Sequence, residues 1–223
     1  MREDLTPYTE RMDCAICQVR RPRRFCPGVQ GEICTICCGT ERETTVACPL
    51  DCPHLREARK HERIEELPPD TMPNQDIRVT EKFLSEHEEL LSFLGECLAA
   101  AALEVPGAVD FDVRASLAAL IRTYRTRQSG LYYDSLPEDA VAASVYRLVE
   151  EGLEKFRKEE TERLGVTRTM DSTVLALLVF LQRLELDRNN GRRRGRAFID
   201  LLREISGSEP GAAGHAASSL LLP

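Results

Sequence analysis

From residue 78 onward, apolar side chains recur at every third or fourth position, which is the spacing of an amphipathic α-helix. This periodicity predicts helices over 78–104, 110–128, 138–164 and 170–187, and a short fifth helix whose apolar residues are Ala197, Phe198, Leu201, Leu202 and Ile205. The fourth segment is apolar nearly all round, so we expect it to be the most buried element. No strand pattern or internal repeat is present in this half. The expected fold class is therefore mainly α, with an all-α bundle of about five helices over 77–206.

Glycine and proline mark the ends of these predicted helices. Pro106 and Gly107 end the first helix, Gly165 is a suitable C-cap for the third, and Asn190 with Gly191 follows the fourth. Residues 207–223 are rich in small and polar residues, a composition that predicts a disordered tail.

Residues 14–54 show no such periodicity and are rich in turns. A segment of this size with so few apolar side chains buries too little surface to fold unaided. A mostly charged helix is expected to start at Pro53, with Asp51 or Cys52 near its cap, and to end at about Leu67. The proline-rich residues 67–76 predict a linker. We therefore expect two domains, a cysteine-rich module over 1–66 and the bundle over 77–206.

The cysteines supply the chemistry of the first domain. Eight of the nine lie between Cys14 and Cys52, and Cys14-x2-Cys17 is followed after sixteen residues by Cys34-x2-Cys37. This is the spacing of a four-thiolate zinc site. Four thiolates around one ion leave no open position for water or substrate, so such a site is structural and not catalytic. Zinc binding would supply on the order of 10 kcal/mol per ion, which this domain needs in order to fold.

The neighbouring residues Cys37 and Cys38 project in different directions, so each is expected to serve its own ion. We assign Cys14, Cys17, Cys34 and Cys37 to a first zinc, and Cys26, Cys38, Cys48 and Cys52 to a second, with His54 as a reserve ligand. Iron is the alternative metal, because thiolate shells also hold iron, although the spacing typical of ferredoxins is absent.

The alternating order of these ligand groups resembles the cross-brace of treble-clef-type zinc fingers, such as the B-box, RING and MYND fingers. The resemblance covers residues 14–54 and does not extend into the helical half. The sequence departs from the family pattern at Cys26, which lacks a C-x2-C partner because position 29 is Val. Families of this kind mostly bind proteins, so the resemblance implies a protein-binding surface on the module.

The acidic net charge disfavours a protein that binds nucleic acid mainly through its phosphates. The formal net charge is −7, and two four-thiolate zinc sites would add −4 to residues 1–65, where eleven basic residues balance eleven acidic ones. Two arginine clusters are nevertheless candidate anion or nucleic-acid contacts: Arg20, Arg21, Arg23 and Arg24, and Arg192, Arg193, Arg194 and Arg196. The plainer interpretations are a solvated loop that offsets thiolate charge and a polar turn between helices.

The sequence contains no nucleophile elbow, phosphate-binding glycine loop, acid–base pair or open metal site, so we assign no catalytic or cofactor-binding residue. We expect a non-enzymatic zinc-binding adaptor, whose zinc module presents a protein-binding surface and is tethered to the bundle. One alternative is a nucleic-acid-binding regulator that uses the two arginine clusters, and another is an enzyme with a small-molecule pocket in the bundle.

The expected location is the cytoplasm, without membrane contact. No apolar run reaches the ~20 residues that span a bilayer. The first residues contain no apolar segment of a secretory signal. Clustered C-x2-C cysteines are typical of a reducing compartment, where they bind metal and do not form disulfides.

Overall fold

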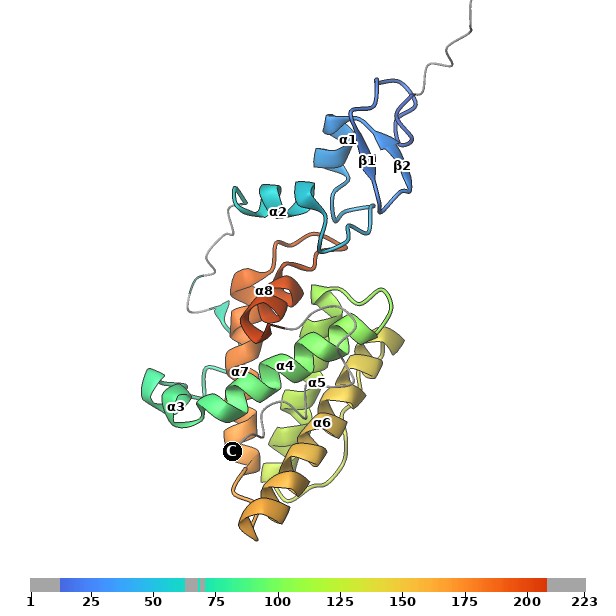
Figure 1. Ribbon diagram of the computed structural model, residues 1–223. Helices are drawn as coiled ribbons and strands as arrows, with labels where there is room; N and C mark the ends of the chain where they lie inside the picture. The colour runs from blue at the N-terminus through green and yellow to red at the C-terminus, as the bar shows by residue number, and fades with distance from the viewer. Residues whose placement is uncertain (1–12, 63–67, 69–70, 208–223) are drawn as a thin grey trace, which may run out of the picture. The chain divides into compact units, whose positions relative to one another are not determined.

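The computed structural model describes residues 13–62, 68 and 71–207 (Figure 1). The described residues form eight helices and one two-stranded sheet, so the protein is mainly helical. Contacts divide the chain into two compact units. In the described part, unit 1 comprises 13–62 with Arg192–Arg194, and unit 2 comprises 68, 71–191 and 195–207. The charged helix expected to run from Pro53 to about Leu67 is shorter than predicted and ends at Arg59. The predicted tail after Gly207 lies outside the described residues.

Unit 1 is built from short elements. Strands β1 (Arg24–Cys26) and β2 (Gly31–Ile33) form an antiparallel hairpin, helix α1 (Thr35–Thr40) follows directly, and helix α2 (Pro53–Arg59) comes later. As expected, α2 begins with a proline at its first position and Cys52 as its N-cap. Neither the hairpin nor α1 was predicted, because three-residue strands and a six-residue helix are too short to show a period.

Sulfur takes the place of hydrocarbon in the core of unit 1. One cluster of buried residues there contains four cysteines and two aliphatic side chains: Cys14, Cys26, Cys34, Cys37, Ile33 and Val46. Cys14 and Ile33 are almost fully inaccessible to solvent. A core of this composition buries little apolar area, so hydrophobic burial alone gives it little stability.

Unit 2 consists of helices. They are α3 (Glu81–Glu86), α4 (Glu88–Glu104), α5 (Asp110–Gln128), α6 (Ala140–Leu164), α7 (Asp171–Arg188) and α8 (Ala197–Ser206). The periodicity located these segments closely, but the predicted helix over 78–104 is in fact two helices. His87, with φ −122° and ψ 26°, leaves the helical conformation and separates α3 from α4. Within the described residues, none of the helices is long and apolar enough to cross a membrane.

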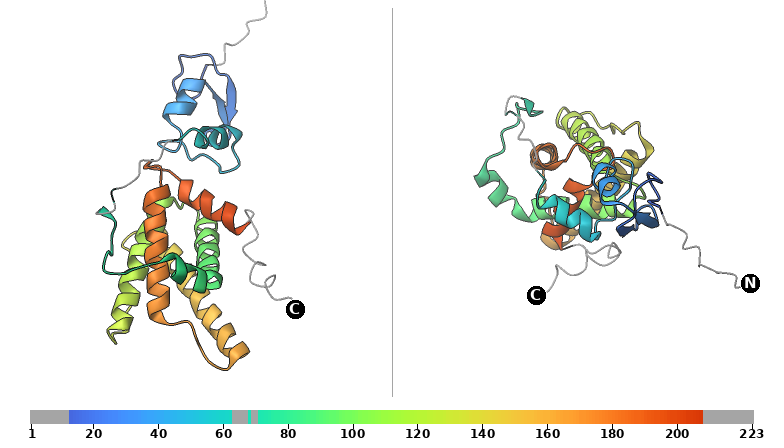
Figure 2. Two further views of the ribbon diagram at one scale, coloured as in Figure 1. Left: turned by 90° about the vertical axis from the view of Figure 1, so that its left-hand side faces the viewer. Right: turned by 90° about the horizontal axis from the view of Figure 1, so that it is seen from above.

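The helices of unit 2 pack in a bundle around α5 and α7. Helix α5 contacts both α6 and α7, and α4 contacts both α6 and α8 (Figures 1 and 2). Helix α7 is buried continuously from Val174 to Val179, as its unbroken apolar character predicted. Gly165 ends α6 in the left-handed conformation, with φ +74°, which confirms the predicted C-cap.

Buried charges in unit 2 are paired with one another. The Glu185 carboxylate is fully buried, and it accepts hydrogen bonds from Arg114 Nε and Asn189 Nδ2, both at 2.6 Å. The Asp110 carboxylate accepts from the backbone N–H groups of Phe198 and Ile199 at 3.0 and 3.1 Å, so the first residue of α5 caps α8. Paired groups of this kind hold helices together, because an unpaired buried charge would be costly.

The described end of the predicted linker 67–76 is held on the bundle by polar contacts. Arg183 of α7 donates to the carbonyl oxygen of Asn74 at 2.6 Å. Arg125 of α5 forms an ion pair with Asp76, with N–O distances of 2.8 Å. These contacts tie residues 73–77 to unit 2, where the prediction expected a free connection.

A close approach between α4 and α6 gives a test of this packing. A methyl group at Gly152 would lie 2.8 Å from Cys97 Sγ. We therefore expect Gly152→Ala to lower the free energy of unfolding by about 1–3 kcal/mol through overpacking, although alanine favours helix by about 1 kcal/mol. In a Cys97→Ala background the same change should be neutral or stabilising. Urea unfolding followed by circular dichroism measures both, and an equal effect in the two backgrounds would contradict this packing.

Candidate metal centre

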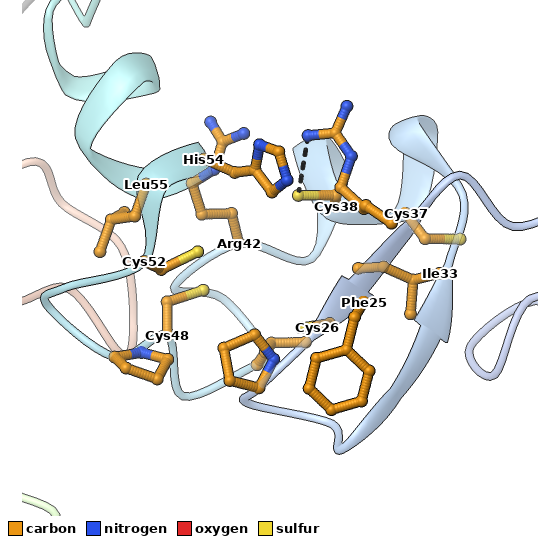
Figure 3. Close-up of a pocket in the computed structure, with 14 residues that line it drawn as sticks. Phe25, Cys26, Ile33, Cys37, Cys38, Arg42, Cys48, Cys52, His54 and Leu55 are labelled. Atoms are coloured by element: carbon orange, nitrogen blue, oxygen red, sulfur yellow. Dashed lines mark hydrogen bonds between the residues drawn. The ribbon is translucent and has the colours of Figure 1, made fainter.

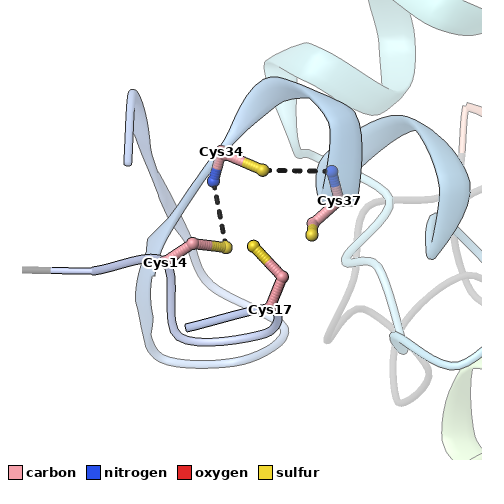
Figure 4. Close-up of side chains that lie close together, drawn as sticks. All are labelled: Cys14, Cys17, Cys34 and Cys37. Carbon is pink, nitrogen blue, oxygen red and sulfur yellow. Dashed lines mark hydrogen bonds between the residues drawn. The ribbon is translucent and has the colours of Figure 1, made fainter. Parts of the chain in front are cut away.

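Four cysteines from two segments face one point in unit 1 (Figure 4). Cys14 and Cys17 lie on the turn before the hairpin, and Cys34 and Cys37 lie at the start of α1. Their Sγ atoms all lie within 4.8 Å of one another, and every one of these residues except Cys17 is buried. The structure thus groups four thiols that could hold one metal ion.

The arrangement fits a tetrahedral ion. Zn–S bonds of about 2.3 Å put the sulfur atoms of a tetrahedron about 3.8 Å apart. The observed spread is therefore about an ångström wider than a closed shell. Two of the sulfurs already accept backbone hydrogen bonds: Cys34 N–H donates to Cys14 Sγ at 3.3 Å, and Cys37 N–H donates to Cys34 Sγ at 3.4 Å. These bonds aim the sulfurs at the common centre, as outer partners of metal ligands do.

The backbone before the hairpin explains why the first pair points inward. Gln18 has φ +53°, a left-handed conformation that closes the turn, and its N–H donates to the carbonyl oxygen of Cys14 at 2.8 Å. The turn is docked on β2, because Ala15 N–H donates to the carbonyl oxygen of Glu32 at 2.9 Å. A side chain at Gly31 would lie 3.1 Å from the Ala15 methyl group, so this position favours glycine.

The four thiols differ in acidity. Burial raises the pKa of Cys14, but hydrogen bonds from the backbone at Cys17, Cys34 and Ile16 outweigh it and bring the value to about 6. Burial, followed by the neighbouring thiols, raises the pKa of Cys37 to about 12. Four thiolates this close repel one another, and a dication would remove that repulsion. Metal binding at this site is therefore expected to release protons.

The other four predicted ligands and His54 line one small pocket on unit 1 (Figure 3). Cys26 ends β1, Cys38 lies in α1, Cys52 precedes α2, and Cys48 lies in the connection between the two helices. The cavity measures about 20 Å³. That is room for a single water-sized species and far too little for a metabolite. The chain thus gathers all five candidate ligands around a space of atomic size.

The candidate ligand atoms of this second group lie less close together than the sulfurs of the first quartet. Among the residues that the structure describes, only the first quartet forms a cluster with all sulfurs within 4.8 Å. In Figure 3 the sulfurs of Cys48 and Cys52 point into the same space, and Cys38 lies beside His54. Cys38 Sγ accepts a hydrogen bond from Arg24 Nη1 at 3.7 Å. Of the adjacent residues Cys37 and Cys38, Cys37 belongs to the quartet, whereas Cys38 does not, and both line the pocket.

The candidate anion contacts are distributed differently from the prediction. In the first cluster, Arg24 Nη1 donates to Cys38 Sγ at 3.7 Å, whereas Arg20, Arg21 and Arg23 are exposed. In the second cluster, Arg192 Nη1 donates to the carbonyl oxygen of Arg42 at 2.7 Å and its Nε lies 3.2 Å from Glu62. Two of its neighbours also have fixed places, because Arg194 N–H donates to the carbonyl oxygen of Glu43 and Arg196 precedes α8. Arg193 is exposed.

The sequence analysis gave compensation of thiolate charge as the plainer interpretation of the first cluster, and the hydrogen bond from Arg24 to Cys38 is consistent with it. The signal was present, because a zinc ion with four thiolates carries a net charge of −2 and the arginines lie between the ligand groups in the sequence. What spacing alone could not give was the direction of each side chain.

No protein-family model, no curated protein and no solved structure matches the chain. The resemblance to cross-brace zinc fingers therefore stays a likeness of cysteine spacing. The structure itself establishes the cluster of Cys14, Cys17, Cys34 and Cys37 as a group that could bind a metal ion.

Removing one sulfur tests this cluster. Cys37→Ser should lose the ion held by the first quartet, because three thiolates and a weak hydroxyl donor bind zinc far less tightly. The matched control is Cys97→Ser in unit 2, where burial raises the pKa of the thiol to about 12. Metal content per chain, measured by plasma emission spectrometry on the purified variants, should fall for Cys37→Ser and stay at the wild-type value for Cys97→Ser. Equal metal content in both would remove the quartet as a site.

Proposed function

We propose that the protein is a non-enzymatic, zinc-binding interaction protein, in which a metal-folded module presents a protein-binding surface and a helical bundle carries it. The observation that carries this proposal is the convergence of four thiols within 4.8 Å at the place where a domain would have its hydrophobic core. Four thiolate ligands complete the coordination of a zinc ion, so the centre holds the fold together and leaves no position for a substrate.

The proposal includes two structural zinc ions. The first quartet holds one, and the pocket lined by Cys26, Cys38, Cys48, Cys52 and His54 would hold the other. The size of the cavity and the number of sulfur donors around it support this second ion. A tetrahedral site needs four of the five candidates. Zinc is favoured over iron because C-x2-C pairs far apart in the sequence are typical of structural zinc sites.

A protein partner is favoured by apolar side chains that lie in water. On unit 1, Val19, Phe25 and Ile36 are 80%, 57% and 52% exposed. On unit 2, the loop between α5 and α6 exposes Leu131, Tyr132, Tyr133 and Leu136. Exposed apolar residues gathered in one segment, as in this loop, are characteristic of interaction sites, whereas single ones need no explanation. Aromatic side chains are also the commonest anchors of protein interfaces.

Two observations favour this function over the alternatives. Contacts with sulfur or backbone oxygen engage Arg24 and Arg192, which leaves fewer guanidinium groups for phosphates. In unit 2, the buried carboxylates Glu185 and Asp110 are satisfied by fixed partners within the bundle. A catalytic carboxylate would instead face a cavity that admits substrate.

Free thiols are consistent with a reducing compartment. All nine cysteines are unpaired thiols in the structure. Since oxidising compartments convert clustered cysteines to disulfides, we place the protein in the cytoplasm as part of this proposal.

Metal analysis of the full-length protein tests the centre of the proposal. We expect about two zinc ions per chain, and no visible absorption from iron. Chelation should unfold unit 1 and leave unit 2 helical, because only unit 1 has a core of thiols. Limited proteolysis with and without the chelator measures this unfolding, because new cleavage sites should appear within residues 13–62. A metal-free preparation with the same protease resistance would overturn the proposal.

A surface variant tests the interaction itself. Phe25→Ser should keep the metal content, because the side chain is exposed, and should weaken binding of the partner recovered with the wild-type chain by about tenfold or more, as expected for an aromatic anchor. Met170→Ser is the matched control, because Met170 is a similarly exposed apolar residue on unit 2. Binding measured at several salt concentrations separates the partner classes: a steep loss of affinity with salt indicates nucleic acid and contradicts the proposal.

A further inference from the structure

The loop between α7 and α8 contains three residues that belong to the cysteine-rich unit. Arg192–Arg194 are grouped with unit 1, whereas the chain up to Gly191 and from Gly195 onward is grouped with unit 2. The chain therefore leaves the helical bundle, contributes a short segment to unit 1 and returns to the bundle. We call Arg192–Arg194 the clasp.

Polar contacts hold the clasp in unit 1. Arg192 Nη1 donates to the carbonyl oxygen of Arg42 at 2.7 Å, and Arg192 Nε lies 3.2 Å from Glu62 Oε1. The backbone N–H of Arg194 donates to the carbonyl oxygen of Glu43 at 2.7 Å. The side chains of Arg192 and Glu62 are 29% and 21% exposed, so salt screens their ion pair less than one at the open surface.

The clasp docks on residues 41–46, which we call the platform. The platform continues directly from α1, because Glu41 N–H donates to the carbonyl oxygen of Cys37 at 2.9 Å. The carbonyl oxygen of Glu41 in turn accepts from the N–H groups of Thr44, Thr45 and Val46 at 3.1 to 3.2 Å. The shape of the platform therefore depends on the helix that carries Cys37, one of the four thiols of the quartet.

Glu43 shows that the platform is held in an unusual conformation. Its φ is +51°, in the left-handed region that residues with a side chain seldom adopt. Its buried carboxylate accepts from Arg59 Nη2 of α2 at 2.8 Å, and its carbonyl oxygen accepts from the clasp. Backbone of this kind persists where several contacts fix it together. The clasp and α2 both supply such contacts at Glu43.

Candidate metal ligands flank the platform on both sides. Cys38 precedes it in the sequence and Cys48 follows it, and both line the pocket of the second group together with Arg42 (Figure 3). An ion held by these two cysteines would fix both ends of the platform. Its loss would free both ends in a unit where hydrophobic burial gives little stability. The carbonyl oxygens of Arg42 and Glu43 would then lose the fixed positions that the clasp requires.

Contacts within unit 2 anchor the ends of the loop independently of the clasp. Gly191, with φ +69°, donates its N–H to Asn189 Oδ1 at 2.6 Å. On the other side, Asp110 N–H donates to the carbonyl oxygen of Gly195 at 2.9 Å. Neither contact involves residues 13–62. Release of the clasp is therefore expected to leave the adjoining ends of α7 and α8 folded.

We propose that the clasp is a metal-dependent contact: metal bound in unit 1 holds the platform in the shape that binds Arg192–Arg194, and the bound clasp strengthens metal binding. The two effects have the same size, because coupling between two binding equilibria is reciprocal. The metal state of unit 1 thus decides whether the loop between α7 and α8 is docked or released. This inference rests on the proposed zinc-binding function and adds a regulated contact to it.

Trypsin measures the state of the clasp, because it cleaves after arginine and all three clasp residues are arginines. In the zinc-loaded, full-length protein we expect slow cleavage after residues 192–194. Removal of zinc with the chelator TPEN should speed this cleavage by about tenfold, a typical size for coupling between sites. The internal control is the exposed Arg168 between α6 and α7, where the rate should change by less than about twofold. Mass spectrometry of the fragments gives both rates.

Substitutions test the coupling in the opposite direction. Arg192→Gln removes the guanidinium that contacts Arg42 and Glu62, so it should weaken zinc binding by about tenfold in competition with the chromogenic chelator 4-(2-pyridylazo)resorcinol. Arg193→Gln is the matched control, because it removes the same charge from an exposed side chain in the same segment, and its affinity should stay within about twofold of wild type.

Arg192→Lys gives a milder change at the same position. It keeps the charge and a donor but lacks the planar fork of the guanidinium, so its zinc affinity should lie between those of wild type and Arg192→Gln. Far-UV circular dichroism of each variant checks that the helices of unit 2 are folded.

The outcomes separate this inference from the proposed function. Wild-type protein without bound metal overturns the proposed function, and the inference with it. Bound metal whose removal leaves the cleavage rate after residues 192–194 unchanged overturns the inference and leaves the function standing. Equal zinc affinities for Arg192→Gln and Arg193→Gln also overturn the inference, because they show that the contacts of Arg192 do not affect metal binding beyond its charge.

Discussion

In the function we propose, the fold of unit 1 depends on the attraction between a dication and thiolates that would otherwise repel one another. Four thiolates within 4.8 Å of one another are unfavourable without a cation, and burial, followed by the neighbouring thiols, raises the pKa of Cys37. The same sulfurs occupy the centre of the unit, with only Ile33 and Val46 as aliphatic members of the cluster. The ion is therefore not an addition to a finished core. In our interpretation, binding the ion and forming the core are one event, with a free energy on the order of 10 kcal/mol.

Unit 2 is stabilised in a different way. Its interior is a conventional set of apolar helix faces, and α7 is buried from Val174 to Val179 without interruption. The charges inside it, such as Glu185 with Arg114, bind each other and fix how the helices pack. Hydrophobic burial and buried ion pairs do not depend on a metal. One chain thus joins a unit expected to respond to metal supply and thiol oxidation with a unit expected to be indifferent to both, a combination suited to an adaptor.

The sequence predicted the structure well wherever an apolar repeat extended over several helical turns or the spacing between cysteines was characteristic. The apolar repeat located α4 to α8 closely, Gly165 and Pro53 were identified from backbone chemistry, and two C-x2-C pairs identified the quartet that the structure groups together. The strands of the hairpin have three residues each and α1 has six, too few for an apolar repeat to be recognised. The break at His87 was hidden because apolar side chains continue through it. The contacts that hold residues 73–77 on the bundle come from Arg125, about 50 positions away, and Arg183, about 110 positions away, which no local pattern reports.

Amino-acid composition is a poor guide to ligand binding in the segment where cysteines and arginines alternate. A run of four arginines in five positions suggests an anion-binding loop when the arginines are counted alone. The spacing of the neighbouring cysteines changes that inference, because each proposed four-thiolate zinc centre would itself be a dianion embedded in the same forty residues. The hydrogen bond from Arg24 Nη1 to Cys38 Sγ is consistent with this local demand. An acidic chain can therefore carry a basic residue whose partner is one of its own cysteines, and the charge left for an external ligand is that of the arginines facing water.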